Sequence, residues 1–130
     1  MLEIRNLNVK YDTIRVIHDV SMRIEEGELV ALIGANGAGK STILKTISGL
    51  IRAEAGRILF SGKDITQMPS HGIVGAGVIH VPEGRQIFSK MTVEENLKLG
   101  AFLQKDKDRI KERMERTFRL FPVLKQRLHQ

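Results

Sequence analysis

The chain has 130 residues, of which 42% are hydrophobic and 28% charged, and this composition is typical of one soluble globular domain. It contains no cysteine, which excludes a disulfide framework and cysteine-based metal sites. No apolar run approaches the ~20 residues that cross a bilayer, and the N-terminus lacks the apolar segment of a signal peptide, so we expect a cytoplasmic protein.

The first third of the chain combines interrupted and continuous apolar segments. Leu2–Val9 and Val20–Ile24 place apolar residues among polar ones, which predicts two half-buried strands. Leu29–Ile33 is apolar throughout, as in a strand that is covered on both faces. Lys40–Ser48 follows as a predicted helix, with Gly49 as its C-cap.

The middle of the chain indicates further strands. Arg57–Phe60 and Lys63–Ile65 flank Ser61-Gly62, which predicts a β-hairpin. Val78–Val81 is a short apolar run before Pro82, and we expect a strand that ends there. Strands mixed with helices in this order predict an α/β fold around a mostly parallel sheet, with an antiparallel portion at the N-terminus.

The last third is predicted to be helical. Thr92 and Glu95 have the spacing of a capping box, which places the start of a helix at residue 93. Val93, Leu97 and Ala101 then share one face of that helix. A second helix is expected over residues 106–121, because a proline follows it at position 122.

The net charge of +6 gathers in this second helix and beyond it. Lys105–Gln130 holds nine basic and four acidic residues, a bias that can indicate nucleic acid. However, Ile110, Met114, Phe118 and Phe121 recur at helical spacing, and no aromatic residue is interleaved with the charges as a base-stacking platform. We therefore interpret the charges as the solvated face of an amphipathic helix and expect no nucleic-acid partner.

A glycine-rich loop lies between the apolar run at 29–33 and the predicted helix. Its sequence, Gly34-Ala35-Asn36-Gly37-Ala38-Gly39-Lys40-Ser41, matches G-x-x-x-x-G-K-[ST] at every fixed position. The glycines let the backbone point its N–H groups inward, and the helix N-terminus adds partial positive charge. Lys40 supplies a full charge for the outer phosphates, and the Ser41 hydroxyl is placed to ligate Mg²⁺. The motif predicts a nucleotide site.

The loop alone does not choose between nucleotides or reactions, because GTPases, kinases and transport ATPases share it. A GTPase would need an Asn-Lys-x-Asp guanine reader, and the sequence contains none. Tyr11, the only tyrosine, lies in a polar turn before Val16, where its ring could stack on adenine. The simpler interpretation of Tyr11 is a half-buried surface residue.

The string Asn36–Thr42 resembles the Walker A motif of ABC transporter ATPases, and the resemblance covers the whole chain. Leu2–Tyr11 resembles the family's opening strand and adenine-stacking A-loop. Residues 80–88 and 91–97 resemble the stretch that joins the Q-loop to the helical subdomain. The Val-Pro-Glu-Gly-Arg sequence at 81–85, with Gly100-Ala101-Phe102, resembles one branch in particular, the LivF-type ATP-binding subunit of branched-chain amino acid importers.

The resemblance implies a P-loop NTPase in which residues 1–86 form the catalytic core, with Walker A and the Q-loop region, and residues 87–130 begin the helical subdomain. It implies ATP and Mg²⁺ as cofactors. It also implies a second ABC ATPase subunit and transmembrane permease subunits as partners, which would hold the protein on the inner face of the membrane. The implied ATP-binding residues are Tyr11, Val16, Asn36, Gly37, Ala38, Gly39, Lys40, Ser41 and Thr42.

The sequence departs from the family pattern in two places. At the Q-loop, where the family usually has glutamine, the aligned residue is Glu83, which would join Ser41 as a Mg²⁺ ligand; the nearby Gln86 is the alternative participant. The second departure is that no family signature, Walker B acid or switch histidine is present. Residues 78–83 are no Walker B strand, because no aspartate ends the run and Pro82 separates the acid from it.

These departures set the expected activity. We expect the full-length protein to drive import by ATP hydrolysis and the 130-residue chain alone to be inactive. Because the strand Leu29–Ile33 would lack a neighbour, we also expect the isolated chain to associate with itself. Two other classes remain open, namely a nucleotide-binding fragment without catalytic activity and a small P-loop kinase, which would need a phosphoryl-acceptor site.

Overall fold

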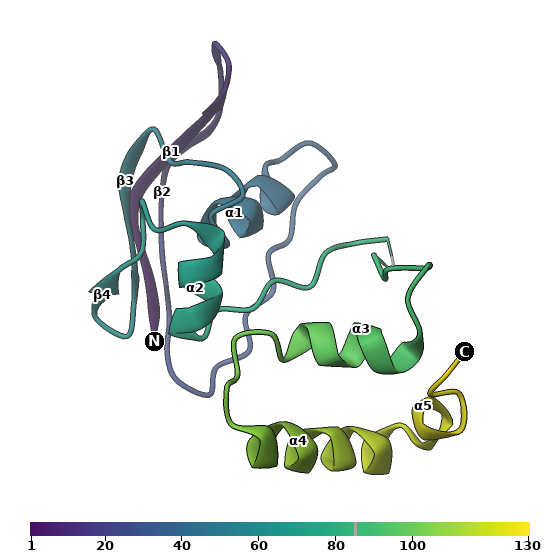
Figure 1. The fold of residues 1–130 in the computed structure, drawn as a ribbon. Helices are drawn as coiled ribbons and strands as arrows, with labels where there is room; N and C mark the ends of the chain where they lie inside the picture. The colour runs from purple at the N-terminus through teal and green to yellow at the C-terminus, as the bar shows by residue number, and fades with distance from the viewer. Residues whose placement is uncertain (85) are drawn as a thin grey trace. The chain divides into compact units, whose positions relative to one another are not determined.

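The computed structural model describes residues 1–84 and 86–130 (Figure 1). The chain divides into two compact units, Met1–Val81 and Pro82–Gln130, and each is described here by itself. The family motifs predicted a boundary after residue 86, a few residues later than the boundary between these two units. The predicted boundary between the catalytic core and the helical subdomain stays a prediction.

The first unit is built on a four-stranded antiparallel sheet with the order β2-β1-β3-β4. The strands are β1 (Leu2–Tyr11), β2 (Ile14–Ile24), β3 (Ala55–Phe60) and β4 (Lys63–Asp64). The predictions of the first two strands and of the hairpin formed by the last two are confirmed, as is the antiparallel portion at the N-terminus.

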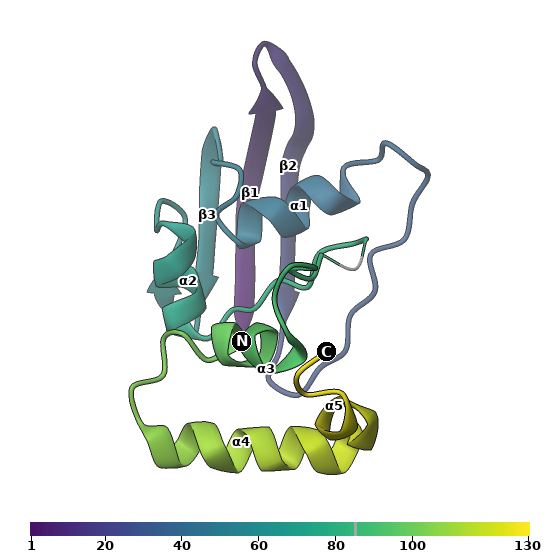
Figure 2. The ribbon, with the colours of Figure 1, turned by 45° about the vertical axis from the view of Figure 1, so that its right-hand side comes forward.

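Two helices of the first unit, α1 (Lys40–Ile47) and α2 (Ser70–Ala76), cover one face of this sheet (Figure 2). The core lies between the sheet and the two helices, because apolar residues alternate along β1 and β2 and recur on the inner side of both helices. Its buried members are Ile4, Leu7, Val9, Ile17, Ile43, Ile47, Ala53, Ile58, Ile65 and Ile73. The predicted helix after the glycine-rich loop is confirmed, and Gly49 follows its C-cap, Ser48, with a φ of +71°.

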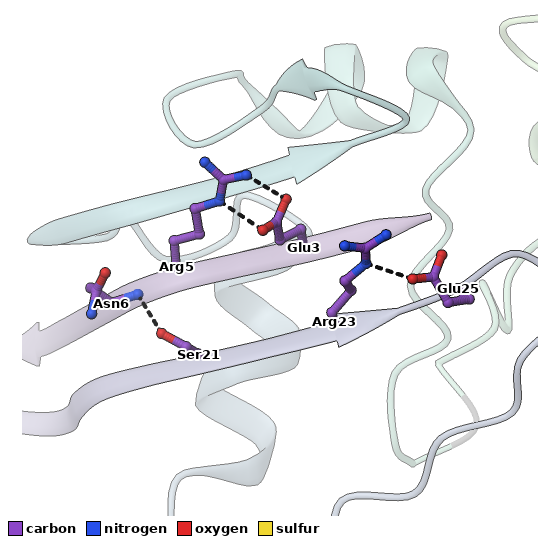
Figure 3. Close-up of polar contacts among 6 residues, drawn as sticks. All are labelled: Glu3, Arg5, Asn6, Ser21, Arg23 and Glu25. Carbon is purple, nitrogen blue, oxygen red and sulfur yellow. Dashed lines mark hydrogen bonds and ion pairs between the residues drawn. The ribbon is translucent and has the colours of Figure 1, made fainter.

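The opposite face of the sheet carries charge. Glu3 receives two hydrogen bonds from Arg5, at 2.7 and 2.8 Å, and Arg23 pairs with Glu25 at the end of β2 (Figure 3). A bulge follows in β1, where Asn6 has a φ of +48° and its backbone N–H donates to Ser21 Oγ. The charged face and the bulge show why the core lies on one side of the sheet only.

Two predicted strands do not form. Residues 29–33 and 78–81 have no strand structure, and among the described residues all strand pairs are antiparallel. A strand depends on hydrogen bonds to a neighbour, and neither run pairs with one, so Leu29 and Ile33 are 98% and 94% exposed. These runs were expected to carry the parallel part of the sheet.

The second unit is helical, with α3 (Val93–Gly100), α4 (Lys107–Leu120) and α5 (Pro122–Gln126). The predicted capping box is confirmed, because Thr92 Oγ1 accepts from the Glu95 N–H and Glu95 accepts from the Thr92 N–H. The carbonyls of Gln130 and Leu128 accept from the first N–H groups of α3. Within this unit, the C-terminal residues therefore pack on the start of α3.

The amphipathic pattern of α4 is weaker than the sequence suggests. Ile110, Met114 and Phe118 are half-buried while the basic residues of the helix are exposed, in line with the solvated-face interpretation. Phe121, expected in the same stripe, is 57% exposed. The helix ends at Leu120, one residue before the predicted end, and Pro122 then occupies the first position of α5, where a proline costs no hydrogen bond.

Candidate functional site

The glycine-rich loop ends where α1 begins, at Lys40. Gly39 is the N-cap and offers no side-chain cap, and the first helical hydrogen bond runs from the Ile43 N–H to the Gly39 carbonyl at 2.9 Å. The N–H groups of Lys40, Ser41 and Thr42 therefore have no partner within the helix. The first turn holds no acidic residue, so the positive end of the helix dipole is not offset there. This end of α1 can accept an anion.

The Lys40 side chain folds back over the loop. Its ammonium donates to the carbonyl oxygens of Gly34 and Ala35, each at 2.8 Å. The Ala38 N–H closes a turn on the Ala35 carbonyl at 3.1 Å. The Lys40 charge is therefore held against the first two residues of the loop.

Gly39 lies directly against strand β2. A β-carbon on Gly39 would come within 2.4 Å of Ile17 Cδ1 and 3.4 Å of the Val16 carbonyl oxygen, and Gly39 has a φ of +88°. Only glycine tolerates this combination of close approach and left-handed backbone. The structure thus brings Val16, a predicted adenine-site residue, beside the predicted phosphate loop.

Most of the other loop residues that are predicted to contact ATP lie at the surface. Asn36, Gly37, Ala38 and Ser41 are exposed. Thr42 is buried in the first turn of α1, where its carbonyl accepts a 2.8 Å hydrogen bond from Thr46 Oγ1. Thr42 therefore anchors the helix start, and a ligand would meet its backbone N–H.

A magnesium ion fits the Ser41 position through its chemistry. Mg²⁺ prefers oxygen ligands and is usually bound by one or two protein groups together with phosphate oxygens and water. The exposed Ser41 hydroxyl stands in the same helical turn as the free N–H groups. Within the described ranges 1–84 and 86–130, no three His, Asp or Glu side chains gather as a separate metal site.

Tyr11 is the last residue of β1 and pairs with Ile14 across the turn at the hairpin tip. Its side chain is 45% exposed. Both the stacking role and the simpler surface interpretation fit this exposure, so stacking on adenine stays a prediction.

Glu83 and Gln86 belong to the second unit, whereas the loop belongs to the first. Both residues are exposed, and Glu83 stands in a bend between Pro82 and Gly84. Their roles toward Mg²⁺ and water stay predictions. Gln86 also lines an apolar groove of about 750 Å³ in the second unit, together with Phe88, Met91 and Leu99.

Sequence reasoning missed two polar contacts near these segments. Glu54 joins Lys10 and Arg15 in an ion-pair cluster beside the hairpin tip. Ser48 Oγ, at the end of α1, lies 3.2 Å from His80 Nδ1, three residues before Glu83. Both contacts join residues more than 30 positions apart, so no local pattern in the sequence marks them.

Comparison with known proteins supports the sequence resemblance. Residues 17–130 match the sequence model of a family described as ABC transporter. The chain is 45% identical over 130 residues to the high-affinity branched-chain amino acid transport ATP-binding protein BraG of Pseudomonas aeruginosa, covering all of this chain and 55% of that protein. It is 36% identical over 125 residues to a probable branched-chain amino acid transport ATP-binding protein LivF of Archaeoglobus fulgidus, covering 96% of this chain and 52% of that protein.

Other relatives transport different compounds. The lipopolysaccharide export system ATP-binding protein LptB of Haemophilus influenzae is 37% identical over 106 residues, covering 82% of this chain and 44% of that protein.

A solved structure of an ATP binding subunit of an ABC transporter matches with a TM-score of 0.86 and 33% identity, over all of this chain and 53% of that one. The chain thus spans about half the length of these relatives.

Proposed function

Because this chain belongs to the ABC transporter family, and its relatives include transport ATP-binding proteins, we propose that it binds ATP with Mg²⁺ at the loop Gly34–Ser41. The observation that supports this proposal is that α1 begins with N–H groups that have no partner within the helix, while the Lys40 ammonium donates to two carbonyls of the adjoining loop. In the full-length protein this site would be part of an ATPase that drives import.

Each residue of the site has a physical role in this proposal. Lys40 exchanges the neutral carbonyl oxygens of Gly34 and Ala35 for anionic outer phosphate oxygens, so that both partners of its hydrogen bonds are charged. The N–H groups of the loop and of α1 hold the phosphate oxygens nearer the base. Ser41 ligates Mg²⁺, which when bound neutralises phosphate charge. Val16 and Tyr11 contact the adenine.

Hydrolysis requires groups that position the attacking water and stabilise the developing charge. We propose Glu83, or Gln86 in its place, as the residue of this chain that contacts Mg²⁺ and water. This chain contributes no further catalytic residue to the proposal. Both candidates are exposed polar side chains on the segment that resembles the Q-loop.

We further propose that the transported solutes are branched-chain amino acids. The support is that BraG and LivF, which match 100% and 96% of this chain, are both named for branched-chain amino acid transport. The LptB match covers less of the chain, at 82%.

The proposed partners are a second ABC ATPase subunit and membrane-spanning permease subunits, which would place the protein at the inner face of the membrane. Among the described residues, none of the helices has the length and apolar character needed to cross a bilayer. We propose that the permease contacts the groove lined by Phe88, Met91 and Leu99, which is mostly apolar and lies in the segment that resembles the entry to the helical subdomain.

The binding proposal is tested by calorimetry with Mg-ATP on the chain and on two lysine variants. Lys40→Ala removes the charge-assisted contact and should weaken binding about tenfold to 150-fold. Lys45→Ala is the matched control, because it removes an exposed lysine from the same helix one turn further on. Equal affinity of the Lys40 variant and the wild type would reject the site.

A further inference from the structure

The carboxylate of Glu54, immediately before β3, holds two cations of the β1–β2 hairpin. Lys10 Nζ lies 2.9 Å from its Oε1. Arg15 approaches Oε2 with two nitrogens, one terminal nitrogen at 2.9 Å and Nε at 3.0 Å. The backbone N–H of Glu54 also donates to the Asn8 carbonyl at 2.8 Å, so the residue is fixed at both ends.

The two cations stand opposite each other in the hairpin, because Lys10 pairs with Arg15 across the strands. Like charges directly opposite one another destabilise an antiparallel pair. A carboxylate shared by both converts this repulsion into attraction. The hydrogen bond from Lys10 also holds the pKa of Glu54 below its usual value.

The position of this cluster along the hairpin is informative. The last cross-strand pair of β1 with β3 is Asn8 with Ala55, so beyond Asn8 the hairpin continues with β2 as the only strand that pairs with β1 in the described part of the chain. Figure 1 and Figure 2 show this tip extending past the rest of the sheet. Glu54 therefore links the two-stranded tip to the third strand.

The residues of the proposed adenine site are the chain neighbours of the two cations. Tyr11 follows Lys10, and Val16 follows Arg15. Successive side chains in a strand point to opposite faces of the sheet. The side chain of Lys10, which contacts Glu54, therefore lies on one face of the tip, and the side chain of Tyr11 lies on the other. Val16 lies beside Gly39 of the phosphate loop, which connects this hairpin to the phosphate site.

We propose that Glu54 is a positioning residue for adenine: by bridging Lys10 and Arg15 it fixes the hairpin tip that presents Tyr11 and Val16 to the nucleotide base. This inference rests on the proposed ATP site. Asp12 and His18 line the same hollow, of about 380 Å³, and are the other titratable groups that face the cluster. Neither is hydrogen bonded to Glu54 in the described contacts.

The test compares Mg-ATP with inorganic tripolyphosphate, which has the phosphates but no base. Calorimetry on Glu54→Gln should show ATP binding weakened about twofold to fivefold, the range of an exposed ion pair, and tripolyphosphate binding unchanged. Glu3→Gln is the matched control. It breaks the ion pair with Arg5, which lies on β1 near the end opposite the hairpin tip (Figure 3). Circular dichroism confirms that each variant is folded.

A second measurement separates positioning from a general effect on the fold. In a Tyr11→Ala background, Glu54→Gln should cause a smaller loss of ATP affinity than in the wild type, because the part of its effect that passes through Tyr11 is already absent. Three results would overturn the role of Glu54: unchanged ATP affinity in Glu54→Gln, equal losses of affinity for ATP and tripolyphosphate, or an additive loss in the double variant. Failure of the proposed ATP site would give a different result, because Lys40→Ala would then leave the affinities for both ATP and tripolyphosphate unchanged.

Discussion

Gly39 of the phosphate loop packs against Ile17 of β2 so closely that a β-carbon on Gly39 would lie 2.4 Å from Ile17 Cδ1. Ile17 is buried in the core and cannot move aside freely. The loop conformation and the core packing are therefore coupled through one methyl group.

Gly39→Ala is expected to destabilise the chain by about 2–4 kcal/mol, from the left-handed backbone and the overpacked core together. Gly37→Ala is the control, because Gly37 has a similar φ of +86° but open space around it, and its expected cost is only about 1–2 kcal/mol. Adding Ile17→Val removes the clashing methyl and should recover part of the Gly39→Ala loss. Urea denaturation measures all three; equal midpoints for the two glycine variants would contradict the contact.

The capping box of α3 predicts a pH dependence. The pKa of Glu95 is lowered, first by its hydrogen bond from the Thr92 N–H. A carboxyl whose folded pKa lies below its unfolded pKa stabilises the helix above the unfolded value and loses that contribution as pH falls through the folded value. Glu95→Gln should therefore increase hydrogen exchange in α3 at neutral pH, and the difference from wild type should vanish below the folded pKa. A difference that persists in acid would argue against the carboxylate as its source.

The Thr92 side of the same box can be tested independently. Thr92→Ala removes the acceptor for the Glu95 N–H and should destabilise the start of α3 by about 1 kcal/mol. Thr92→Ser keeps the hydroxyl and should retain most of the stability. Similar hydrogen exchange in the alanine and serine variants would show that the cap contributes little.

The proposed permease contact predicts a selective defect. Ile87→Asp places a charge on a 73%-exposed residue of the groove and should reduce co-purification with co-expressed branched-chain importer permeases while sparing ATP affinity. Leu120→Asp is the control, since Leu120 is similarly exposed, at 65%, but lies on α4 outside the groove lining. Equal permease recovery with both variants would remove the groove from the interface.

Local patterns predicted the elements whose determinants are close in sequence. The capping box at Thr92, the turn at Ser61-Gly62 and the start of α1 each depend on a few adjacent residues, and each prediction is confirmed. Helix α2 was missed because Gly72 and Gly75 lower its helix propensity, although Gly77 after its end, with a φ of +107°, is a usual stop signal.

Predictions of structure that depends on a distant partner in the chain were wrong for the two strands at 29–33 and 78–81. The apolar composition of 29–33 predicted a buried strand, but Leu29 and Ile33 are 98% and 94% exposed, because a strand needs a second strand to pair with and the local sequence cannot supply it. The same limit applies to the site. The phosphate loop follows from its own eight residues, whereas the Glu54 cluster exists only because folding brings Arg15 next to a residue 39 positions away.

The exposed run at 29–33 leads to a prediction about the isolated 130-residue chain. Leu29, Val30 and Ile33 are 98%, 38% and 94% exposed, and unpaired apolar segments of this kind pair readily with other chains. We expect concentration-dependent self-association, and we expect Leu29→Lys with Ile33→Lys to reduce it, because two charges oppose apolar contact. The control is Ile14→Lys, at a 69%-exposed residue of the hairpin tip. Sedimentation velocity over a range of concentrations measures the effect. A wild-type chain that stays monomeric throughout that range would contradict the prediction, and so would a double-lysine variant that associates as strongly as the wild type.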